Sequence, residues 1–359
     1  MIITTSICAN YLPKAMVLAK SIKKADPTIK VVVSLLEREV TPEAQAFEYF
    51  DDIVLGKDLG FENFEKFIFK HSIVEASTAV KGQLFLYLME NYQEESKFVY
   101  LDPDIQVLSP LTELEEALES NPIVLTPHLT TPEDIMDAVM DNELSALKHG
   151  AFNLGFLAVS RSEESKRFIE WWASRLNMFC YDDIPRGIFT DQKWMDLAPC
   201  FFDVYILKHP GYNAAPWNVS KRKIHLDSND EYRVNDKFLR FFHFSGFDSG
   251  ANEGMINKYV PDKKNAIYTL RDEYVNEMNI MGQEELGAIP WSYDYFNSGE
   301  KIDRATRIAY RDNLEMPYKF QDPFTNSNAE LNATSEQIVK KENFVKGIKK
   351  VVKSILINK

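Results

Sequence analysis

Two acidic residues follow a hydrophobic segment near residue 100 in a pattern that suits cation binding. Residues 98–101, Phe-Val-Tyr-Leu, have the length and the aromatic and β-branched content of a buried strand. Pro103 favours an extended conformation at Asp102, so the side chains of Asp102 and Asp104 project to the same side. Such a pair can hold a hard divalent cation that also binds phosphate oxygens. The alternative is a surface turn, because Asp and Pro are common turn residues.

A histidine far along the chain is a candidate third ligand. His243 lies within residues 241–244, Phe-Phe-His-Phe, which have the composition of a strand and are followed by Ser245 and Gly246. A single histidine in an apolar run is more often a hydrogen-bonded core residue than a metal ligand. Only the two distant aspartates favour a metal-binding role for it.

Two polar positions stand at the entrance of another predicted strand, residues 156–159. The amide of Asn153 can both donate and accept hydrogen bonds, which suits the hydroxyl groups of a sugar. Gly155 would allow another backbone or a ligand to approach closely. The alternative is an ordinary β-turn, in which Asn and Gly are both common.

An acid and an amide side by side form a second candidate pair. Asp191 and Gln192 precede a lysine and a tryptophan, and such a polar pair is out of place in a plain amphipathic helix. They could begin a helix with Thr190 as its N-cap. They could equally present a carboxylate and an amide to a substrate.

Three further features could contact a ligand. Lys81 lies on or beside the buried face of a predicted helix over residues 72–92, where its ammonium could reach a phosphate or extend into water. Tyr11 could stack on a nucleobase or cap the edge of the core. Residues 209–218 have the aromatic, loop-like composition of a sugar-handling surface.

The elements that would position these residues alternate between strands and helices. The first part of the chain predicts strands at 2–7, 30–36 and 52–55, with helices beginning at Pro13 and spanning 42–50. This alternation predicts an α/β fold with a mainly parallel sheet, in which ligands bind beyond the carboxyl ends of the strands. The loop at 8–11 and the acidic turn both fall at that edge.

The middle of the chain continues the alternation, and the pattern loosens beyond residue 256. Further predicted helices span 112–120, 132–148, 163–176, 262–280 and 303–313, with a strand at 123–126 and a linker at 316–328. No internal repeat is visible. The fold prediction is therefore one α/β domain followed by a helical and irregular C-terminal extension.

Composition excludes several classes of protein. A net charge of −13 argues against a nucleic-acid-binding protein. Three scattered cysteines without metal-like spacing predict a reducing compartment. The N-terminus shows no signal peptide, and no window is long and apolar enough for a transmembrane helix. We therefore expect a cytoplasmic protein.

The last 26 residues differ from the acidic body. Residues 334–337, Thr-Ser-Glu-Gln, fit a capping box, and residues 334–359 carry seven lysines and two glutamates. The lysines gather opposite an apolar face, as in a basic amphipathic helix. Such a helix predicts contact with the inner-membrane surface, at about 1 kcal/mol per lysine near anionic lipid. The alternative is a helix docked on its own protein or on a partner subunit.

Four short motifs, in this order, resemble a known family. They are Tyr-Leu-Asp-Pro-Asp at 100–104, Phe-Asn-Leu-Gly at 152–155, Thr-Asp-Gln at 190–192 and His-Phe-Ser-Gly at 243–246. Together they resemble the signature of nucleotide-sugar glycosyltransferases with the GT-A (Rossmann-like) fold. The similarity is greatest to family 8-like retaining enzymes of bacterial surface polysaccharide synthesis, and it covers roughly the first 250 residues.

The resemblance implies a role for each candidate residue. Asp102, Asp104 and His243 would bind Mn²⁺ or Mg²⁺ against the diphosphate of the donor, and nitrogen ligation favours manganese. Asn153 and Gly155 would lie at the donor sugar. Asp191 and Gln192 would be the catalytic pair beside the anomeric carbon. The nucleotide would contact Asp102 and the first loop, which is formed by Ala9, Asn10 and Tyr11.

One segment departs from the family pattern. The family's histidine segment usually continues to a Lys-Pro-Trp that grips the diphosphate, whereas here Gly246 is followed by Phe-Asp-Ser-Gly-Ala. Lys81 then becomes the substitute candidate for contact with the nucleotide's phosphates. Retention of the donor sugar's anomeric configuration is implied only by the resemblance to family 8, and this departure from the family pattern counts against it.

The resemblance gives a domain division and a function. Residues 1–255 would form the catalytic domain, 256–330 an extension on the acceptor side, and 334–359 the basic helix. The predicted activity is metal-dependent hexosyl transfer from a nucleoside-diphosphate sugar, with UDP expected, to a glycan or lipid-linked acceptor. Two alternatives remain: a metal-dependent phosphohydrolase, and a non-catalytic carbohydrate- or nucleotide-sugar-binding protein.

Overall fold

The computed structural model describes residues 1–341 of the 359, and the chain forms two compact units. The first unit consists of Met1–Gly60 and Glu75–Trp291. The second combines Phe61–Val74 with the C-terminal part of the chain from Ser292. The first unit ends at residue 291. The division into a catalytic domain over 1–255 and an acceptor-side region over 256–330 stays a prediction.

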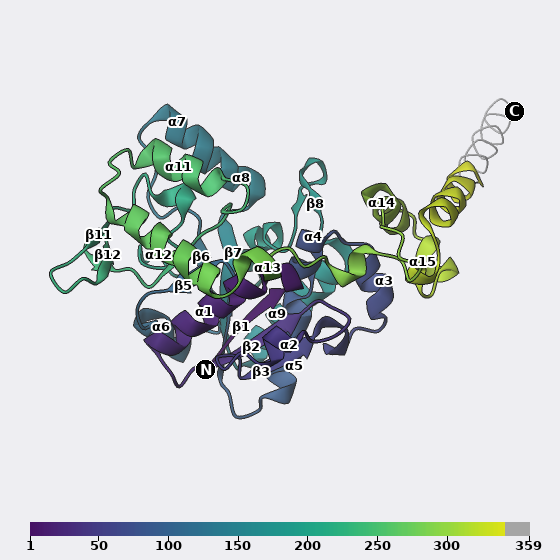
Figure 1. The fold of residues 1–359 in the computed structure, drawn as a ribbon, viewed down its shortest axis with the longest axis horizontal. Helices are drawn as coiled ribbons and strands as arrows, with labels where there is room; N and C mark the ends of the chain where they lie inside the picture. Colours follow the sequence, from purple (N-terminus) through teal and green to yellow (C-terminus); the bar gives the residue numbers. More distant parts are fainter. Residues whose placement is uncertain (342–359) are drawn as a thin grey trace, which may run out of the picture. The chain divides into compact units, whose positions relative to one another are not determined.

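A seven-stranded sheet forms the centre of the first unit, in the order β10-β6-β7-β4-β1-β2-β3 (Figure 1). Strand β7 runs antiparallel to β4 and β6, and the other neighbours are parallel. The strands are β1 Ile2–Ile7, β2 Lys30–Leu35, β3 Asp52–Leu55, β4 Lys97–Leu101, β6 Ile123–Pro127, β7 Phe152–Ser160 and β10 Val204–Ile206. The predicted α/β class with a mainly parallel sheet and flanking helices is confirmed.

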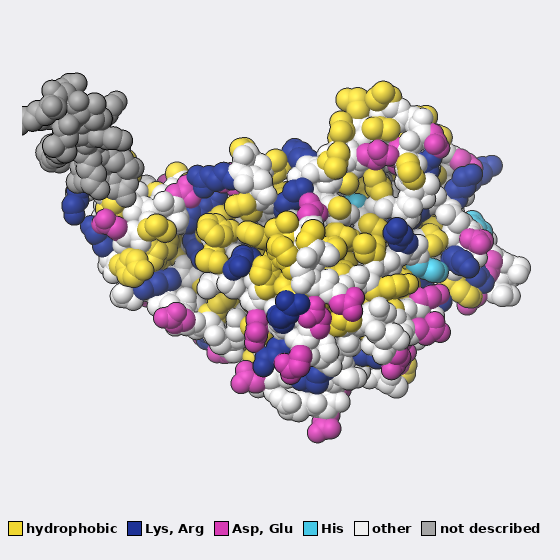
Figure 2. All heavy atoms as spheres, turned by 180° about the vertical axis from the view of Figure 1, so that it is seen from behind, with side chains coloured by type: hydrophobic (Ala, Val, Ile, Leu, Met, Phe, Trp, Pro, Cys, Tyr) yellow, Lys and Arg dark blue, Asp and Glu magenta, His cyan; other side chains and the backbone are white. Residues whose placement is uncertain are grey.

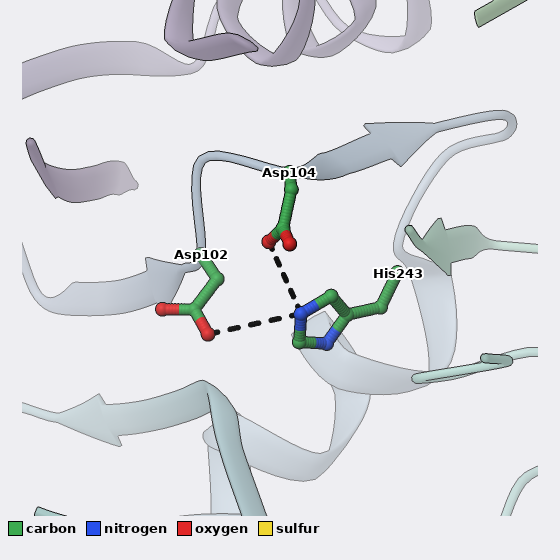
Figure 3. A group of neighbouring side chains, drawn as sticks. All are labelled: Asp102, Asp104 and His243. Atoms are coloured by element: carbon green, nitrogen blue, oxygen red, sulfur yellow. Dashed lines mark ion pairs between the residues drawn. The ribbon is translucent and has the colours of Figure 1, made fainter. Parts of the chain in front are cut away.

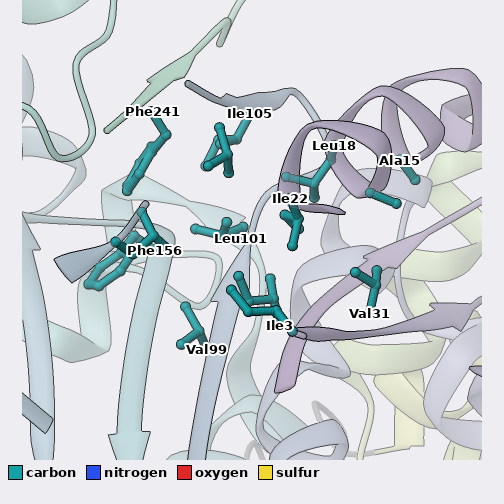
Figure 4. Packing of buried hydrophobic residues seen from close by; sticks show 14 of the residues in the cluster. Ile3, Ala15, Leu18, Ile22, Val31, Val99, Leu101, Ile105, Phe156 and Phe241 are labelled. Carbon is teal, nitrogen blue, oxygen red and sulfur yellow. The ribbon is translucent and has the colours of Figure 1, made fainter. Parts of the chain in front are cut away.

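Both faces of this sheet are buried. Ile3 and Val99 point to the face covered by helix α1, where Leu18 and Ile22 pack against them (Figure 4). Alternate residues point the other way, and they are buried as well. The main helices of the unit are α1 Leu12–Ala25, α5 Lys81–Asn91, α6 Thr112–Ser120, α9 Glu163–Phe179, α11 Ala251–Tyr259 and α12 Ala266–Ile280. Each fully buried Leu, Ile or Val contributes about 1.5–3 kcal/mol by leaving water.

A short antiparallel ribbon beside the sheet brings distant parts of the chain together. Strand β5, Ile105–Val107, pairs with β14, Phe241–His243, so that His243 lies opposite Ile105. The N–H of Phe244 donates to the Asp104 carbonyl at 2.8 Å. The apolar side of this ribbon packs on the core through Ile105 and Phe241 (Figure 4). The ribbon therefore fixes His243 next to the acidic turn.

Several predicted helices are shorter or broken in the structure. The predicted helix over 72–92 is two helices, α4 Ile73–Ala79 and α5, and Lys81 is the first residue of α5. Near this break, a Cβ on Gly82 would lie 2.6 Å from the Ala173 Cα. The glycine therefore allows α5 to pack closely on α9. The predicted helix over 42–50 is only Pro42–Gln45, and the helix predicted from 262 begins at Ala266.

The segment predicted as one helix over 132–148 has an irregular middle. It consists of α7 Met136–Ala138, a π-helical turn over Val139–Glu143, and α8 Leu144–His149. Apolar side chains stay exposed along it: Ile135, Met136, Met140, Leu144 and Leu147. Figure 2 shows hydrophobic side chains gathered over this segment, at the upper right of that view. No helix among the described residues is long and apolar enough to cross a bilayer.

The second unit has a small aromatic core of its own. Phe69 of α3, Phe64–Phe69, packs against Phe296, Tyr310 and Phe324. The predicted helix over 303–313 is confirmed as α14, Arg304–Asp312. The predicted linker over 316–328 contains a helical turn, α15 Met316–Lys319, and a 3₁₀ turn at Pro323–Thr325.

The helix predicted to start at Thr334 starts earlier. Residues 328–341 are helical, so Thr334 lies inside the helix and the predicted capping box is wrong. Residues 342–359, which include most of the lysines of the basic segment, lie outside the described residues. Contact of this segment with a membrane surface stays a prediction.

Candidate functional site

The three predicted metal ligands lie together at the end of β4. Figure 3 shows the carboxylates of Asp102 and Asp104 and the imidazole of His243 pointing toward one another. The His243 Nε2 is 3.1 Å from Asp104 Oδ1 and 3.8 Å from Asp102 Oδ2. The Asp102 N–H donates to the Gly155 carbonyl at 2.9 Å, which holds the start of the turn against β7. Two oxygens and one nitrogen thus converge from three separate positions in the sequence.

Asp102, Asp104 and His243 together are called the metal corner below. Charges within this corner stabilise one another. Burial opposes the charge on Asp104, but attraction to His243 and the bond to its ring outweigh burial and lower the pKa of Asp104. Burial likewise opposes a charged His243, but the neighbouring Asp104 more than compensates and raises the pKa of the imidazole. In the protein alone, Asp104 and His243 therefore stabilise each other's charged form.

The donor set also fits a divalent cation. One ligand atom from each of Asp102, Asp104 and His243 lies within 4.8 Å of the others, so a single ion could contact all three. Carboxylate oxygens suit Mg²⁺ and Mn²⁺ alike, whereas an imidazole nitrogen favours Mn²⁺. A bound cation would supply positive charge beside the two carboxylates.

Lys81 joins the metal corner to the predicted catalytic pair. Its ammonium is 3.1 Å from Asp102 Oδ1, 3.0 Å from Asp191 Oδ2 and 2.9 Å from the Leu154 carbonyl. Burial disfavours the ammonium, but the two carboxylates more than offset it, so the pKa of Lys81 is well above its usual value. The ammonium donates hydrogen bonds to Asp102 and to the Leu154 carbonyl, and its contact with Asp191 is an ion pair. A phosphate could bind this ammonium only by replacing one of these partners.

Asp191 is buried beside that lysine. Burial raises the pKa of Asp191 above its usual value, although the Lys81 ammonium acts in the opposite direction. The preceding residue, Thr190, has a φ of +44°, which is rare for a β-branched residue, and its hydroxyl donates to Asp191 Oδ1 at 3.1 Å. Thr190 is therefore not the predicted helix cap. It is a strained position, and such positions are concentrated at functional sites.

The amide of Gln192 is held by the backbone at both ends. Its Oε1 accepts from the Leu154 N–H at 3.1 Å, and its Nε2 donates to the His149 carbonyl at 3.2 Å. Asn153 Nδ2 donates to the same Oε1 at 3.3 Å. Gln192 is therefore buried and has a fixed orientation in this structure.

Asn153 stands between Gln192 and the metal corner. Its Oδ1 accepts from the Gly155 N–H at 3.0 Å and from Asn213 Nδ2 at 2.9 Å. Its Nδ2 also lies 3.2 Å from Nε2 of His128, whose pKa burial lowers to about 4, so this ring is neutral and can accept. With its amide fully engaged, Asn153 could bind a donor sugar only by exchanging a partner.

Gly155 is a glycine because the His243 ring packs against it. A Cβ at this position would lie 2.4 Å from His243 Cε1 and 2.8 Å from Asn153 Oδ1. These distances are too short for any side chain. The close approach that the sequence predicted at this glycine is therefore made by the imidazole.

The predicted nucleotide loop, Ala9–Tyr11, is a 3₁₀ turn after β1. The Ala9 N–H donates to Glu37 Oε1 at 2.8 Å, and the Tyr11 hydroxyl donates to Asp248 Oδ2 at 3.0 Å. Asn10 Oδ1 is buried without a hydrogen-bond partner among the described residues. This loop therefore contains a buried acceptor whose hydrogen-bonding capacity is unused in the structure.

Sequence reasoning missed two residues of the site and misplaced one segment. Residues 209–218 were predicted to form an aromatic surface, but Tyr212, Asn213 and Asn218 are buried. Asn213 bonds to the ring of His243, and Lys14 ion-pairs with Asp248 beside the nucleotide loop. The sequence shows Asn213 only as one more turn-forming residue, so no local pattern could have identified it.

Comparison with known proteins gives a family match over more than half of the chain. The model of Glycosyl transferase family 8 matches residues 2–207, a stretch that ends before His243. No curated protein matches the sequence. Similar solved structures include the galactosyltransferase LgtC in complex with donor and acceptor sugar analogs, at 17% identity and a TM-score of 0.43. That match covers 72% of this chain and 96% of the other.

Two other solved structures have lower sequence identity. The glycosyltransferase GlyE of Streptococcus pneumoniae TIGR4 is 12% identical with a TM-score of 0.42, over 82% of this chain and 66% of the other. Mouse xyloside xylosyltransferase 1 in its apo form is 12% identical with a TM-score of 0.38, over 68% of this chain and 97% of the other.

Proposed function

The chain belongs to glycosyl transferase family 8, and we propose that it transfers a hexose from a nucleoside-diphosphate sugar, with UDP as the nucleotide. The reaction would depend on a divalent metal, retain the anomeric configuration and use a glycan or lipid-linked acceptor. The observation that carries this proposal is the convergence of Asp102, Asp104 and His243 on one point at the end of β4. Family membership establishes a glycosyltransferase, and this corner supports its dependence on metal.

The bound metal would supply positive charge against the departing diphosphate. Asp102, Asp104 and His243 would hold it, with Mn²⁺ favoured over Mg²⁺ because one ligand is nitrogen. The first loop, Ala9–Tyr11, would bind the nucleoside: Tyr11 offers a ring for stacking and Asn10 an unpaired oxygen. These contacts would place the diphosphate between the first loop and the metal corner.

The reacting sugar would lie on the opposite side of the metal corner. Asp191 and Gln192 would flank its anomeric carbon and stabilise positive charge that develops there. Asn153 would bind the sugar's hydroxyl groups, and the absence of a side chain at Gly155 would leave room for the His243 ring. Lys81 would hold Asp191 and Asp102 at a fixed separation, through its contacts of 3.0 and 3.1 Å. Most of the rate enhancement would then come from positioning and fixed charge.

The exposed apolar residues of the α7–α8 segment favour a lipid-linked acceptor. Met140, Leu144 and Leu147 are more than half exposed, and the segment ends at His149, whose carbonyl binds Gln192. The apolar part of an acceptor lying along this segment would bring its sugar toward the catalytic pair. We therefore expect the double variant Met140→Ser with Leu147→Ser to lose activity toward a lipid-linked acceptor and to keep activity toward a soluble sugar.

The cellular setting follows from the same proposal. The enzyme would act in the cytoplasm during synthesis of a surface polysaccharide. It would bind the inner membrane surface through the basic segment 334–359.

The test combines ligand binding with turnover in the full chain. Nucleoside diphosphates and nucleotide sugars are screened by thermal shift with and without Mn²⁺, and the stabilising donor is then assayed for release of nucleoside diphosphate. A ligand that binds the folded state raises stability by RT ln(1 + [L]/Kd). We expect Mn²⁺-dependent stabilisation by one nucleotide, and a product whose anomeric configuration matches that of the donor.

Asp102→Ala should lower turnover by about 10³-fold or more, because loss of a single preorganised stabilising group already costs on the order of 10²–10³. As a folding control, thermal unfolding is measured without metal. The melting temperature of the variant should stay close to that of the wild type. Wild-type turnover by this variant would refute the assignment. Release of phosphate from simple esters would indicate a phosphohydrolase, and metal-dependent donor binding without turnover would indicate a non-catalytic protein.

A further inference from the structure

Asn213 touches one of the predicted metal ligands from outside the metal corner. It is 1% exposed, and its Oδ1 lies 3.2 Å from His243 Nδ1. The backbone keeps it there: the His243 N–H donates to the Ala214 carbonyl at 2.8 Å, and Asn218 Nδ2 donates to the Asn213 carbonyl at 3.0 Å. Its φ is +54°, a conformation that Asn adopts more readily than most residues.

The direction of each hydrogen bond in this group follows from a single backbone donor. The Gly155 N–H can only donate, so the atom of Asn153 that it contacts at 3.0 Å is the oxygen. The Asn213 atom 2.9 Å from that oxygen must then be its nitrogen, which also lies 3.0 Å from the hydroxyl of Thr126. The remaining side-chain atom of Asn213 is an oxygen, and it faces His243 Nδ1. An oxygen there can only accept, so Nδ1 must carry the proton.

We propose that Asn213 is a positioning residue that fixes His243 in its Nδ1–H tautomer and so directs the lone pair of Nε2 toward a divalent cation shared with Asp102 and Asp104. The cation itself rests on the proposed function, whereas the tautomer does not. Nε2 is the nitrogen that faces both carboxylates, at 3.1 and 3.8 Å. A neutral ring with its proton on Nε2 would turn a hydrogen toward the metal position and could not bind there.

Packing alone does not select this tautomer. The His243 ring lies against Gly155 on one side and is 5.2 Å from the Trp217 ring, edge to face, on another. Those contacts set the plane of the ring and are indifferent to which nitrogen carries the proton. Two contacts described within residues 1–341 do distinguish the two forms. The Asn213 oxygen favours a proton on Nδ1, whereas Asp104 Oδ1, 3.1 Å from Nε2, favours a proton on Nε2 for as long as no cation takes its place.

The network also links the metal corner to the predicted catalytic pair. Asn213 binds Asn153, and Asn153 Nδ2 donates to Gln192 Oε1 at 3.3 Å. The Leu154 N–H fixes that Oε1 independently, at 3.1 Å. Two backbone N–H groups on the same strand, β7, thus orient three amides and one imidazole.

The test separates tautomer from packing with three variants of the full chain. Asn213→Gly removes the acceptor and tolerates the positive φ. Asn213→Asp keeps an oxygen facing Nδ1, but its second oxygen cannot donate to Asn153 Oδ1 as the Asn213 nitrogen does. Thr126→Val is the matched control, because it removes another buried partner of Asn213 and leaves the bond to His243 intact. Binding of Mn²⁺ without donor is measured by calorimetry. The protonated ring nitrogen is identified by ¹⁵N NMR of histidine-labelled, metal-free protein, at a pH where the imidazole is neutral.

We expect the wild type, Thr126→Val and Asn213→Asp to show the Nδ1–H form of His243, and the wild type and Thr126→Val to have similar affinities for Mn²⁺. Asn213→Gly should show a mixture of tautomers, and its Kd for Mn²⁺ should rise by about 10- to 100-fold, the usual cost of losing an outer-shell partner of a metal ligand. Retained affinity and an unchanged tautomer in Asn213→Gly would overturn the proposal. Equal loss of affinity in Thr126→Val would do the same, because it would show that packing alone is responsible.

Two further outcomes are informative. If Asn213→Gly does not fold, Asn213→Asp and the wild-type spectrum still decide, since an Nε2–H form in either would contradict the assignment. If the wild type shows the Nδ1–H form but binds no Mn²⁺, the proposed metal dependence fails while the orientation of His243 stands.

Discussion

Two lysines of the first unit are equally buried, but the acidic residues that pair with them differ in their exposure to solvent. Lys14 and Lys81 each expose 2% of their side chain. Each ammonium also lies over a tyrosine ring, 3.8 Å from the centroid of Tyr11 for Lys14 and 4.2 Å from that of Tyr100 for Lys81. Their acidic partners differ. Asp191, beside Lys81, exposes 3% of its side chain, whereas Asp248, beside Lys14, exposes 52%.

We infer from this difference that the exposure of the counter-ion, and not that of the lysine, decides how firmly a buried charge is held. The ammonium of Lys81 has a buried carboxylate and a backbone carbonyl, neither of which can turn to water when the lysine is removed. Asp248 can be hydrated in place, so its pair with Lys14 is a weaker constraint. The Lys81 corner is therefore a fixed framework, and the Lys14 corner can exchange its partner.

Replacing Lys81 with methionine should have the largest effect on stability. The change leaves Asp191 buried without its cation, and removal of one member of a buried ion pair costs about 3–5 kcal/mol. Urea unfolding of the first unit, followed by tryptophan fluorescence, measures the loss. The matched control is Lys20→Met: Lys20 is 39% exposed and pairs with Glu277 at the surface, where loss costs about 0–1 kcal/mol. An equal loss of unfolding free energy in Lys81→Met and Lys20→Met would show that burial of the counter-ion does not strengthen the ion pair.

A second variant tests whether packing contributes to the rigidity of the neighbouring metal corner. Gly155→Ala places a methyl group 2.4 Å from the His243 ring, and overpacking of this kind costs about 1–3 kcal/mol. The ring should also shift relative to Asp104, so the affinity for Mn²⁺ should fall. Gly254→Ala is the control, because no atom of the described residues lies within 4 Å of the place where its Cβ would stand, and the helix should gain up to about 1 kcal/mol. A stable Gly155→Ala variant with normal affinity would show that the corner can deform.

An ion pair of intermediate exposure should have an intermediate effect that depends on pH. Glu113 exposes 32% of its side chain and accepts from Arg240 Nη2 and Nε at 2.7 and 2.8 Å. Burial opposes its charge, but the bonds from Arg240 dominate and lower the pKa of Glu113 from 4.5 to about 2. Because the folded pKa is the lower one, the contribution to stability is complete above about pH 4.5 and is lost as the pH falls to about 2.

The corresponding variant is Glu113→Gln, studied by urea unfolding between pH 2 and pH 7. Wild type should exceed the variant by about 1–2 kcal/mol near neutral pH, after allowance for the water that reaches the carboxylate. This difference should shrink toward zero as the pH approaches 2. A difference that is independent of pH would show that the pair contributes through shape and not through charge.

The sequence predicts the sheet and half of the metal corner well, because both depend on local patterns. Buried strands end where their apolar runs end. The two carboxylates lie together as predicted, but Pro103 and Asp104 form a turn closed by the Ile105 N–H, which donates to the Asp102 carbonyl at 3.1 Å, and not the predicted extended conformation. His243 required the family resemblance, since its place beside Asp104 depends on the pairing of β5 with β14. Nothing local in either segment specifies that pairing.

The remaining features of the site depend on contacts between distant segments. Lys81 was predicted to contact phosphate. Its ion pairs with Asp102 and Asp191 could not be foreseen from the sequence, because they run from α5 to two distant loops. Asn213 looks like any turn residue until its side chain is seen between His243 and Asn153. The π-helical turn over Val139–Glu143 has no signal in a helical pattern, which specifies a helix but not an extra residue within it.

The smallest expected change is that of Lys14→Met, and its dependence on salt tests the comparison most directly. Asp248 regains water when Lys14 loses its charge, so the free energy of unfolding should fall by about 1 kcal/mol or less. Because the exposed carboxylate is open to counter-ions, the difference from wild type should shrink between 0.05 and 1 M NaCl, where the Debye length falls to about 3 Å. The loss caused by Lys81→Met should stay nearly constant over that range, because Asp191 is shielded from the solvent. If the two lysine variants respond to salt alike, the exposure of the counter-ion does not govern how these charges are held.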